Sequence, residues 1–365
     1  MIAEKKYYPQ LDAIRGISFL VIFMYHSFKP SGGSDFFDKF LLYIYNNLPL
    51  SIDVFFILSA FLLTLLGMNE FDKTGKFSFK KYFIRRALRI WPLYFLLMFF
   101  SFVILQAAQK YTGQQITLPP AEFYLFFVSN FYFPDHVFFL RILWTLSVEE
   151  QFYFFWGISL WLFQKHLKIV ILIFTLISLT FVIVQTAKGI GIYFHTLTYI
   201  IDMMAGAYAA YSIKKNNGII SGMKKITGYK AISFYISFPV LFIVFFFIDR
   251  TVTGVFTFLV SEALRFIFIM YCGLMIIHQM VIDKPVINLS NKKFLIYTGK
   301  ISYGLYCLHG FVISFGILFF RNINFHLPVV LNGGLLLGIT FLLASVSYFF
   351  FEKPFLQLKD RFYRS

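Results

Sequence analysis

The chain has 365 residues, of which 59% are hydrophobic, 22% aromatic and only 14% charged, and its formal net charge is +16. A soluble globular domain carries about 25% charged residues, so this composition excludes an ordinary soluble enzyme and a disordered chain. Two cysteines exclude a disulfide framework. In a membrane protein, a positive net charge is typical of basic cytoplasmic loops beside anionic lipid, and we expect no nucleic acid partner.

The apolar segments predict an all-α fold, a polytopic membrane bundle of about ten transmembrane helices. Each segment is close to the roughly 20 apolar residues that cross a bilayer. We expect a single integral-membrane domain over residues 1–365, without an appended soluble domain. The predicted spans, in chain order, are Ala13–Phe28, Leu48–Met68, Ile90–Ala108, Thr145–Phe163, Lys168–Thr186, Phe194–Ile213, Ala231–Ile248, Phe258–Ile282, Ile301–Phe320 and Val329–Phe351.

Lysines and arginines gather in alternate loops between these spans. The two chain ends and the even-numbered loops hold 24 of them, whereas the odd-numbered loops hold seven. Basic loops stay on the cytoplasmic side of a membrane. The asymmetry therefore predicts that both termini are cytoplasmic and that the protein is a multi-pass protein of the inner, or cytoplasmic, cell membrane.

The first span contains two ionisable residues, Arg15 and His26. Eleven helical steps of 100° return to about 20° from the start, so both side chains project from one helix face, separated by a rise of ~16 Å. With the N-terminus inside, Arg15 lies near the cytoplasmic face and His26 lies in the outer half. Ionisable residues within a span are costly and therefore mark candidate functional sites.

Three carboxylates are predicted at the depth of His26. Asp53 opens the second span, and Glu149 and Glu150 open the fourth, each from the outer side. A carboxylate that orients an imidazole and stabilises its charged form prepares it to act as a general base. Two plainer interpretations stay open: a structural histidine bonded to a neighbouring helix, and a hydrated glutamate pair favoured by the helix dipole.

Arg86 and Arg89 precede the third span on its cytoplasmic side. Their i, i+3 spacing places them on one helix face, and guanidinium groups bind phosphate through paired hydrogen bonds. Together with Arg15, they are candidates for binding a phosphorylated cytoplasmic ligand. The alternative is that the positive-inside rule and lipid head groups account for the pair.

Polar residues in the last two spans form a second group of candidates. Ser302, Tyr306 and His309 make one helical stripe in the ninth span. We interpret the stripe either as the lining of a polar channel or as interhelical hydrogen bonding. Glu352 ends the tenth span on the cytoplasmic side, where an arginine is its expected partner.

Two further spans contain charges that these assignments leave aside. Glu262 and Arg265 in the eighth span are three residues apart, so we expect them to neutralise each other. Asp202 in the sixth span has no partner that the sequence predicts.

Six short segments are specific when taken together and follow one another along the whole chain. They are Leu11–Gly16, Ile52–Phe61, Arg86–Pro92, Trp144–Tyr153, Ile301–His309 and Phe351–Pro354. In these segments and in their order, the chain resembles the acyltransferase family 3 membrane proteins, which include bacterial O-acetyltransferases of surface polysaccharides. One departure is Ala60, where the family usually has glycine.

The resemblance implies transfer of an acyl group, usually acetyl, from cytoplasmic acetyl-CoA (an acyl-CoA) to an outer hydroxyl of a polysaccharide, lipopolysaccharide or other glycolipid. It implies that His26 is the catalytic histidine, that Arg15 is its motif partner, and that Arg86 and Arg89 handle the donor. We expect no metal. We also expect no hydrolase-like C-terminal extension, which some family members carry.

The residues and the resemblance together give one hypothesis and one alternative. Catalytic roles are predicted for His26, Asp53, Glu149 and Glu150. The imidazole would either deprotonate the acceptor or take the acyl group briefly as a nucleophile. Acyl-CoA binding is predicted for Arg15, Arg86, Arg89, Ser302, Tyr306 and Glu352. The alternative is a secondary transporter or exporter component, since transporters also have about ten spans with charges near the midplane.

Overall fold

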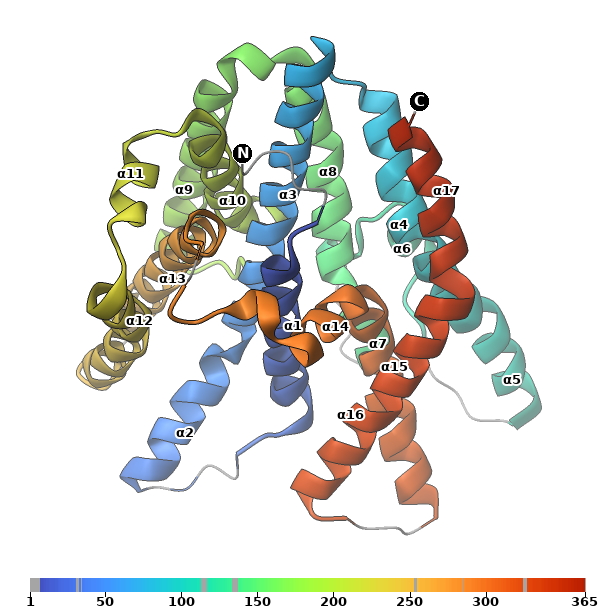
Figure 1. Cartoon of the computed structure of the whole chain (residues 1–365). Coiled ribbons are helices and arrows are strands. Elements are labelled where there is room, and N and C mark those ends of the chain that lie inside the picture. The colour runs from blue at the N-terminus through green and yellow to red at the C-terminus, as the bar shows by residue number, and fades with distance from the viewer. Residues whose placement is uncertain are drawn as a thin grey trace. The chain divides into compact units, whose positions relative to one another are not determined.

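The computed structural model describes residues 7–30, 33, 35–112, 117–132, 137–252, 255–283, 285–323 and 327–364. Throughout these described residues, every regular element is helical (Figure 1). The predicted all-α fold is therefore confirmed.

Seven helical stretches are long and apolar enough to cross a membrane. They make the chain a polytopic helical membrane protein. The stretches are Phe36–Thr74, Phe79–Ala108, Gln164–Ala187, Gly228–Asp249, Phe256–Val281, Ser302–Asn322 and Val329–Leu358.

The other three predicted spans are also helices, but they are less apolar. They are α1 (Pro9–Ser27), α8 (Trp144–Leu162) and α10 (Thr196–Lys215). These three helices carry the buried charges Arg15, Glu150 and Asp202, which lower their mean hydropathy. That all ten helices cross the bilayer stays a prediction.

Contacts divide the chain into two compact units. The first consists of Met1–Phe77, Leu162–Tyr193 and Leu197–Lys300. The second consists of Ser78–Trp161, Phe194–Thr196 and Ile301–Ser365. Residues of the predicted site occur in both units, so each unit is described separately.

The first unit contains α1 and the helices that pack around it. Its other elements are α2 (Phe36–Asn47), η2 (Leu48–Leu50), α3 (Ser51–Thr74), η5 (Gln164–His166), α9 (Leu167–Ala187), α10, α11 (Gly218–Lys224), α12 (Gly228–Asp249), α13 (Val255–Val281), η6 (Leu289–Asn291) and α14 (Lys293–Lys300). Its core joins Ile14 of α1, Phe61 of α3 and Ile276 of α13. This core holds α1 and α3 side by side, and both carry predicted site residues.

Glycines allow α1 to lie close to α14 in the first unit. A Cβ atom on Gly16 would collide with the carbonyl oxygen of Leu295, and one on Gly299 would collide with the backbone of Asp12. Small residues of this kind let helix backbones approach closely inside membranes. The crossing therefore holds the N-terminal half of α1 against α14.

The sequence did not predict α2, which lies in a segment expected to be a loop. Asp35 caps the helix by accepting a hydrogen bond from the backbone N–H of Asp38 at 2.7 Å. Its aromatic side chains pack on α12, where the Phe40 and Phe246 ring centroids are 5.0 Å apart. An N-cap and aromatic packing therefore extend the second predicted span into a longer helical stretch.

The second unit is built around α4 (Phe79–Phe99), α8 and α15 (Ser302–Asn322). Its core includes Tyr94, Leu140 and Phe311. A π-helical turn, η3 (Phe100–Ile104), continues α4 into α5 (Leu105–Thr112). The remaining elements are α6 (Ala121–Leu125), η4 (Ser129–Phe131), α7 (Phe138–Arg141), α16 (Val329–Val346), the π-helical turn η7 (Ser347–Glu352) and α17 (Lys353–Arg364).

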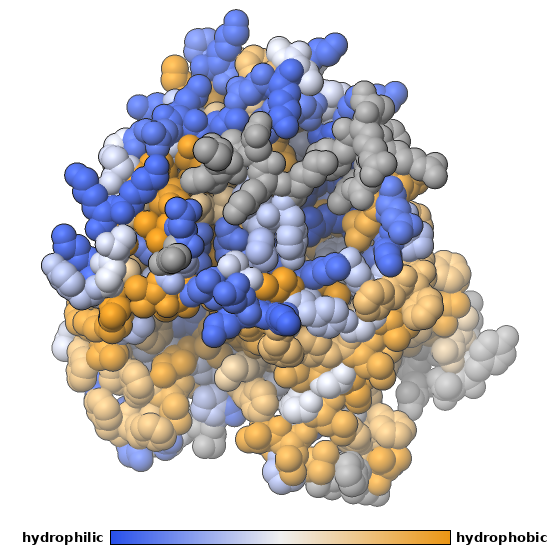
Figure 2. Space-filling view, in the orientation of Figure 1, coloured by the Kyte–Doolittle hydropathy of each residue, from blue (hydrophilic) through white to orange (hydrophobic). Residues whose placement is uncertain are grey.

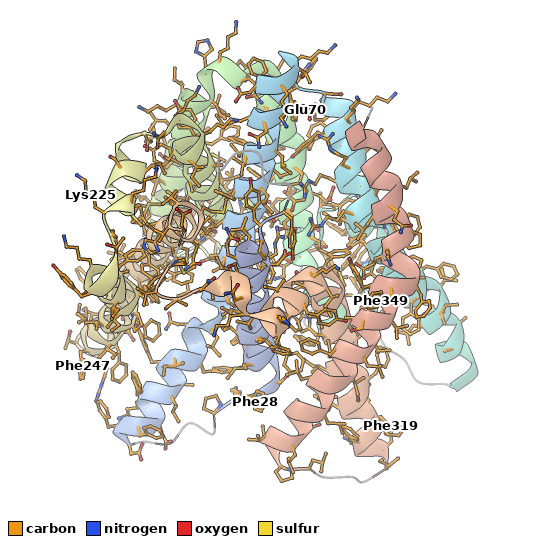
Figure 3. The ribbon with its side chains drawn as sticks, in the orientation of Figure 1. Phe28, Glu70, Lys225, Phe247, Phe319 and Phe349 are labelled. Carbon is orange, nitrogen blue, oxygen red and sulfur yellow. The ribbon has the colours of Figure 1, made fainter. Side chains whose placement is uncertain are left out.

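Exposed apolar side chains cover the outer helices of both units. Figure 2 shows mainly hydrophobic surface over α12 and over α16. Val240 on α12 and Val330 on α16 are 51% and 71% exposed. In the first unit, Figure 3 shows Glu70 and Lys225 near one end and Phe28 and Phe247 near the other. Apolar surface of this extent is typical of a lipid-facing helix and not of a soluble surface.

Candidate functional site

Arg15 and His26 lie on α1, which is one uninterrupted helix. Arg15 is buried, and its Nη1 donates a hydrogen bond to Asp12 Oδ1 at 3.3 Å, one turn earlier. His26 is half-buried in the last turn, with its ring 5.1 Å from that of Tyr25. The helix therefore carries the guanidinium of Arg15, hydrogen-bonded to Asp12, near its start and the imidazole of His26 at its end, separated by a rise of ~16 Å.

Asp53 belongs to a buried ion cluster in the first unit. Arg265 Nε donates to Asp53 Oδ2 at 3.2 Å, and Arg265 Nη2 donates to both carboxylate oxygens of Asp202, at 2.9 and 2.7 Å. Glu262 Oε2 lies 3.8 Å from Arg265 Nη1. The predicted Arg265–Glu262 pair is present, but the shorter contacts go to α3 and α10.

The Arg265 cluster therefore joins three helices that are distant in sequence. The guanidinium also lies 5.0 Å from the ring centre of Tyr199, and its Nη2 donates to the carbonyl oxygen of Thr198 at 3.4 Å. Asp202 is fully buried and Asp53 nearly so. Buried charges persist where they are paired in this way. The structure thus supplies the partner of Asp202 that the sequence did not predict.

In the second unit, α4 and α8 run in opposite directions (Figure 1) and are connected through side chains. Tyr82 donates its hydroxyl to the carbonyl oxygen of Tyr153 at 3.0 Å. Nine residues further along α4, Trp91 Nε1 donates to Glu150 Oε2 at 3.3 Å. A Cβ atom on Gly157 would meet the ring of Tyr82, so this glycine lets the ring lie against α8.

Arg86 and Glu150 are neighbours along this helix pair. The guanidinium of Arg86 lies 5.8 Å from the ring centre of Tyr153, one turn from Glu150, and the charges of Arg86 and Glu150 are close enough to interact. We expected the arginine pair near the cytoplasmic face and the glutamate pair in the outer half. That separation is not observed, because α4 begins well before the predicted third span and runs alongside α8.

Glu150 is buried, whereas Glu149 is half-buried. Adjacent side chains point about 100° apart around a helix, so only one of the two points into the interior of the second unit. Among the described residues, Glu150 Oε1 has no hydrogen-bond partner. The predicted contact of these carboxylates with His26 stays a prediction, because His26 belongs to the first unit.

Tyr306 and Ser302 lie on α15 as a buried stripe. The Tyr306 hydroxyl donates to the carbonyl oxygen of Ile142 and accepts from Thr145 Oγ1, both at 2.9 Å. His309 Nδ1 lies 2.5 Å from the carbonyl oxygen of Tyr306. The two bonds of Tyr306 reach outside α15 and support the interhelical hydrogen-bonding interpretation of the stripe, while acyl-CoA binding by Ser302 and Tyr306 stays a prediction.

Glu352 lies in the π-helical turn η7 and is buried. Its Oε1 accepts a hydrogen bond from Ser347 Oγ at 2.9 Å. A Cβ atom on Gly304 of α15 would lie 2.8 Å from the same oxygen, so the glycine makes room for the carboxylate. Arg89 is near enough to interact electrostatically with Glu352, as the sequence led us to expect for one of the arginines.

Sequence reasoning missed a buried amide network in the second unit. Gln151 Nε2 donates to Asn130 Oδ1 and to the carbonyl oxygen of Phe127, both at 2.8 Å. Asn130 Nδ2 donates to Thr196 Oγ1 at 3.1 Å. The only sequence signal was the position of Gln151 directly after the glutamate pair. The network fastens the segment before α8 to the helix itself, next to Glu150.

No group of three or more His, Cys, Asp or Glu side chains is arranged to hold a metal ion within the described ranges of the chain.

Comparison with known proteins connects these features to a family. Residues 8–349 match the acyltransferase domain of the Acyl_transf_3 family. The chain belongs to acyltransferase family 3. This match confirms the resemblance of the six sequence segments, and it favours an acyltransferase over a transporter.

Similar proteins carry names that point to O-acetyl transfer. A Staphylococcus aureus (strain COL) protein named "Putative O-acetyltransferase" is 28% identical over 96% of this chain and 58% of its own length. The peptidoglycan O-acetyltransferase of Listeria monocytogenes is 26% identical over 96% of this chain and 56% of its own length. The chain thus spans little more than half the length of these relatives. No solved structure matches the chain.

Proposed function

We propose that the chain is a membrane O-acetyltransferase that transfers acetyl from cytoplasmic acetyl-CoA to a hydroxyl of a cell-envelope polysaccharide. The observation that carries this proposal is the family match over residues 8–349, together with a similar protein named for peptidoglycan O-acetylation. Because the curated relatives are much longer than this chain, its activity, acceptor and donor are all parts of the proposal. We further propose ten crossings of the cell membrane, with both termini in the cytoplasm.

Donor binding is assigned to the arginines of α4. Arg86 and Arg89 are both half-buried and share one face of the helix. The phosphates of acetyl-CoA carry several negative charges, which guanidinium groups bind through paired hydrogen bonds. Arg15 is the third cationic candidate, on α1 of the first unit, where Asp12 holds it.

His26 is assigned the role of general base. It takes the proton of the acceptor hydroxyl as the oxygen attacks the thioester carbonyl carbon. The new C–O bond forms, the C–S bond breaks, and the CoA thiolate leaves and is protonated in turn. A two-step route, in which the imidazole carries the acetyl group first, uses the same residue and gives the same products.

A carboxylate partner for His26 completes the proposal. Of the three predicted candidates, Asp53 and Glu150 already have donors within their own units, Arg265 and Trp91. Asp53 lies in the same unit as His26, on the helix that packs beside α1. We therefore assign Asp53 to the buried ion cluster that holds α3. Which carboxylate orients the imidazole stays a prediction from the sequence.

The decisive experiment uses purified protein in lipid vesicles with isotopically labelled acetyl-CoA and peptidoglycan-derived oligosaccharides. We expect labelled O-acetyl product with the unaltered chain and at least a ~100-fold slower reaction with His26→Ala, because a general base contributes about 10²–10⁴ in rate. Normal folding of the variant is checked by size-exclusion chromatography. Full activity of His26→Ala would remove the proposed base, and no transfer to any hydroxyl by the unaltered chain would remove the function.

A further inference from the structure

Only one of the two carboxylate oxygens of Glu150 has a hydrogen-bond partner among the described residues. Its Oε2 accepts the indole N–H of Trp91, while its Oε1 has no hydrogen-bond partner among the described residues. The residue is only 7% exposed. Buried polar atoms in folded proteins are nearly always hydrogen-bonded. Protonation does not remove the requirement, because a buried O–H needs an acceptor as much as an oxygen needs a donor.

The open oxygen lies next to the proposed donor site. Arg86 sits over the ring of Tyr153, one turn along α8 from Glu150. Along α4, Arg86 precedes Trp91 by five residues. At 1.5 Å per residue, these two spacings place Arg86 about 5–8 Å from Glu150 along the helix pair. A ligand whose phosphate is held by Arg86 would therefore present its next few bonds to Glu150.

The chemistry of an acyl-CoA matches this arrangement. Its diphosphate is followed within a few bonds by a hydroxyl and then by an amide N–H, the first polar groups of the pantetheine arm. Both are hydrogen-bond donors, whereas Glu150 Oε1 in its ionised form only accepts. The neighbouring walls are aromatic, from Tyr82, Trp91 and Tyr153, and they suit the apolar carbons of the arm.

We propose that Glu150 Oε1 accepts a hydrogen bond from the hydroxyl or amide N–H of the donor's pantetheine arm, next to the phosphates held by Arg86. The inference rests on the proposed function, because it presumes an acyl-CoA donor. It makes Glu150 a donor-binding residue, with its orientation set by Trp91, and not a partner of the imidazole. The donor's arm then enters along the α4–α8 pair of the second unit.

The test compares two probes on the full-length chain in lipid nanodiscs, by isothermal titration calorimetry. The probes are CoA and adenosine 3′,5′-bisphosphate, which has phosphates but lacks the arm. Glu150→Gln replaces one of the two carboxylate oxygens with an NH2 group, which donates, so Trp91 and a ligand donor at the opposite oxygen no longer both meet an acceptor. We expect this variant to bind CoA about tenfold more weakly, the low end for a hydrogen bond to a charged group, and to bind the bisphosphate within twofold of the unaltered chain.

Two other variants frame this result. Arg86→Ala should weaken both probes by a similar factor, because it removes a phosphate contact. Glu122→Gln, which changes an exposed glutamate of α6 in the same unit, should leave both affinities unchanged. If Glu150→Gln does not fold, Trp91→Phe provides the second route. It removes the donor that orients the carboxylate, and we expect at least threefold weaker binding of CoA with unchanged binding of the bisphosphate.

Three other outcomes would refute either the contact between Glu150 and the pantetheine arm or the proposed donor. CoA affinity in Glu150→Gln equal to that in Glu122→Gln would refute the arm contact, even if the acetyl transfer rate fell. Equal weakening of both probes would also refute it, because Glu150 would then act on the phosphate site. Binding of neither probe by the unaltered chain would instead refute the donor assigned in the proposed function.

Discussion

A single guanidinium in the first unit faces three carboxyl groups. Each nitrogen of Arg265 points to a different partner: Nε to Asp53, Nη2 to Asp202 and Nη1 to Glu262. Only the last of these was visible in the sequence, since it is three residues away. The other two are separated from Arg265 by 212 and 63 residues. Sequence gives the approximate depth of a charge in the bilayer, but it does not give the rotation of the helix that carries it.

Removal of Arg265 should lower the stability against unfolding more than removal of one of the carboxylates that pair with it. In Arg265→Leu, the buried Asp53 and Asp202 lose the guanidinium that pairs with both of them, whereas Asp202→Asn leaves the guanidinium with two other carboxyl groups. Breaking a buried ion pair from one side costs about 3–5 kcal/mol. In thermal unfolding followed by tryptophan fluorescence, we expect Arg265→Leu to lower the Tm by at least ~5 °C, and Asp202→Asn by less.

The double variant supplies the control for this prediction. Arg265→Leu combined with Asp202→Asn should regain part of the lost Tm, because one uncompensated carboxylate is gone as well. Equal melting of Arg265→Leu and the unaltered chain would show that the cluster adds nothing to stability.

Close helix crossings, and not hydrophobicity alone, determine how the elements of the first unit pack. Gly16 on α1 lies against the backbone of α14, and Gly206 on α10 lies against the carbonyl oxygen of Ile57 on α3. The apolar pattern predicted where α3, α9 and α12 occur, and it placed Arg15 and His26 on one helix. It did not predict α14, which has only eight residues, and it did not predict that α4 and α8 align Arg86 with Glu150.

Substitution at the α1–α14 crossing should disrupt the first unit. In Gly16→Val, the added side chain would meet the carbonyl oxygen of Leu295, which is backbone and cannot move aside cheaply. Overpacking of this kind costs about 1–3 kcal/mol or more. We expect less monodisperse protein in detergent by size-exclusion chromatography. The control is Ile17→Val, an exposed neighbour on the same helix. An unchanged elution profile for Gly16→Val would show that α14 can shift away.

For the molecule as a whole, the number of crossings depends on the three polar helices α1, α8 and α10. The seven apolar stretches alone do not fix which side each loop faces, because every additional crossing reverses the loops after it. The positive-inside rule predicts the side of each loop from the sequence, since it counts the charges of many loops together. The acceptor could not be predicted in the same way, because a sugar hydroxyl leaves no compositional trace in the chain.

Cysteine labelling tests the crossing of α10 directly. Both native cysteines, Cys272 and Cys307, are buried, so a single introduced thiol gives the signal. Lys188 directly follows α9, and Lys225 directly follows α11. With a membrane-impermeant maleimide on intact cells, we expect labelling of Lys188→Cys at once and of Lys225→Cys only after permeabilisation. Labelling of both without permeabilisation would mean that α10 does not cross and that the chain has fewer than ten spans.

The hydrogen bond between Trp91 and Glu150 also couples the fluorescence of Trp91 to the surroundings of the carboxylate. Indole emission responds to the electric field along the ring, and here a carboxylate touches the indole nitrogen at 3.3 Å. We therefore expect a hydrogen-bonding group that approaches the opposite oxygen to redistribute the charge of that carboxylate and to shift the emission of Trp91. The chain has only four tryptophans, so we expect ligand binding beside Glu150 to be measurable as a shift in the tryptophan emission wavelength, without an added dye.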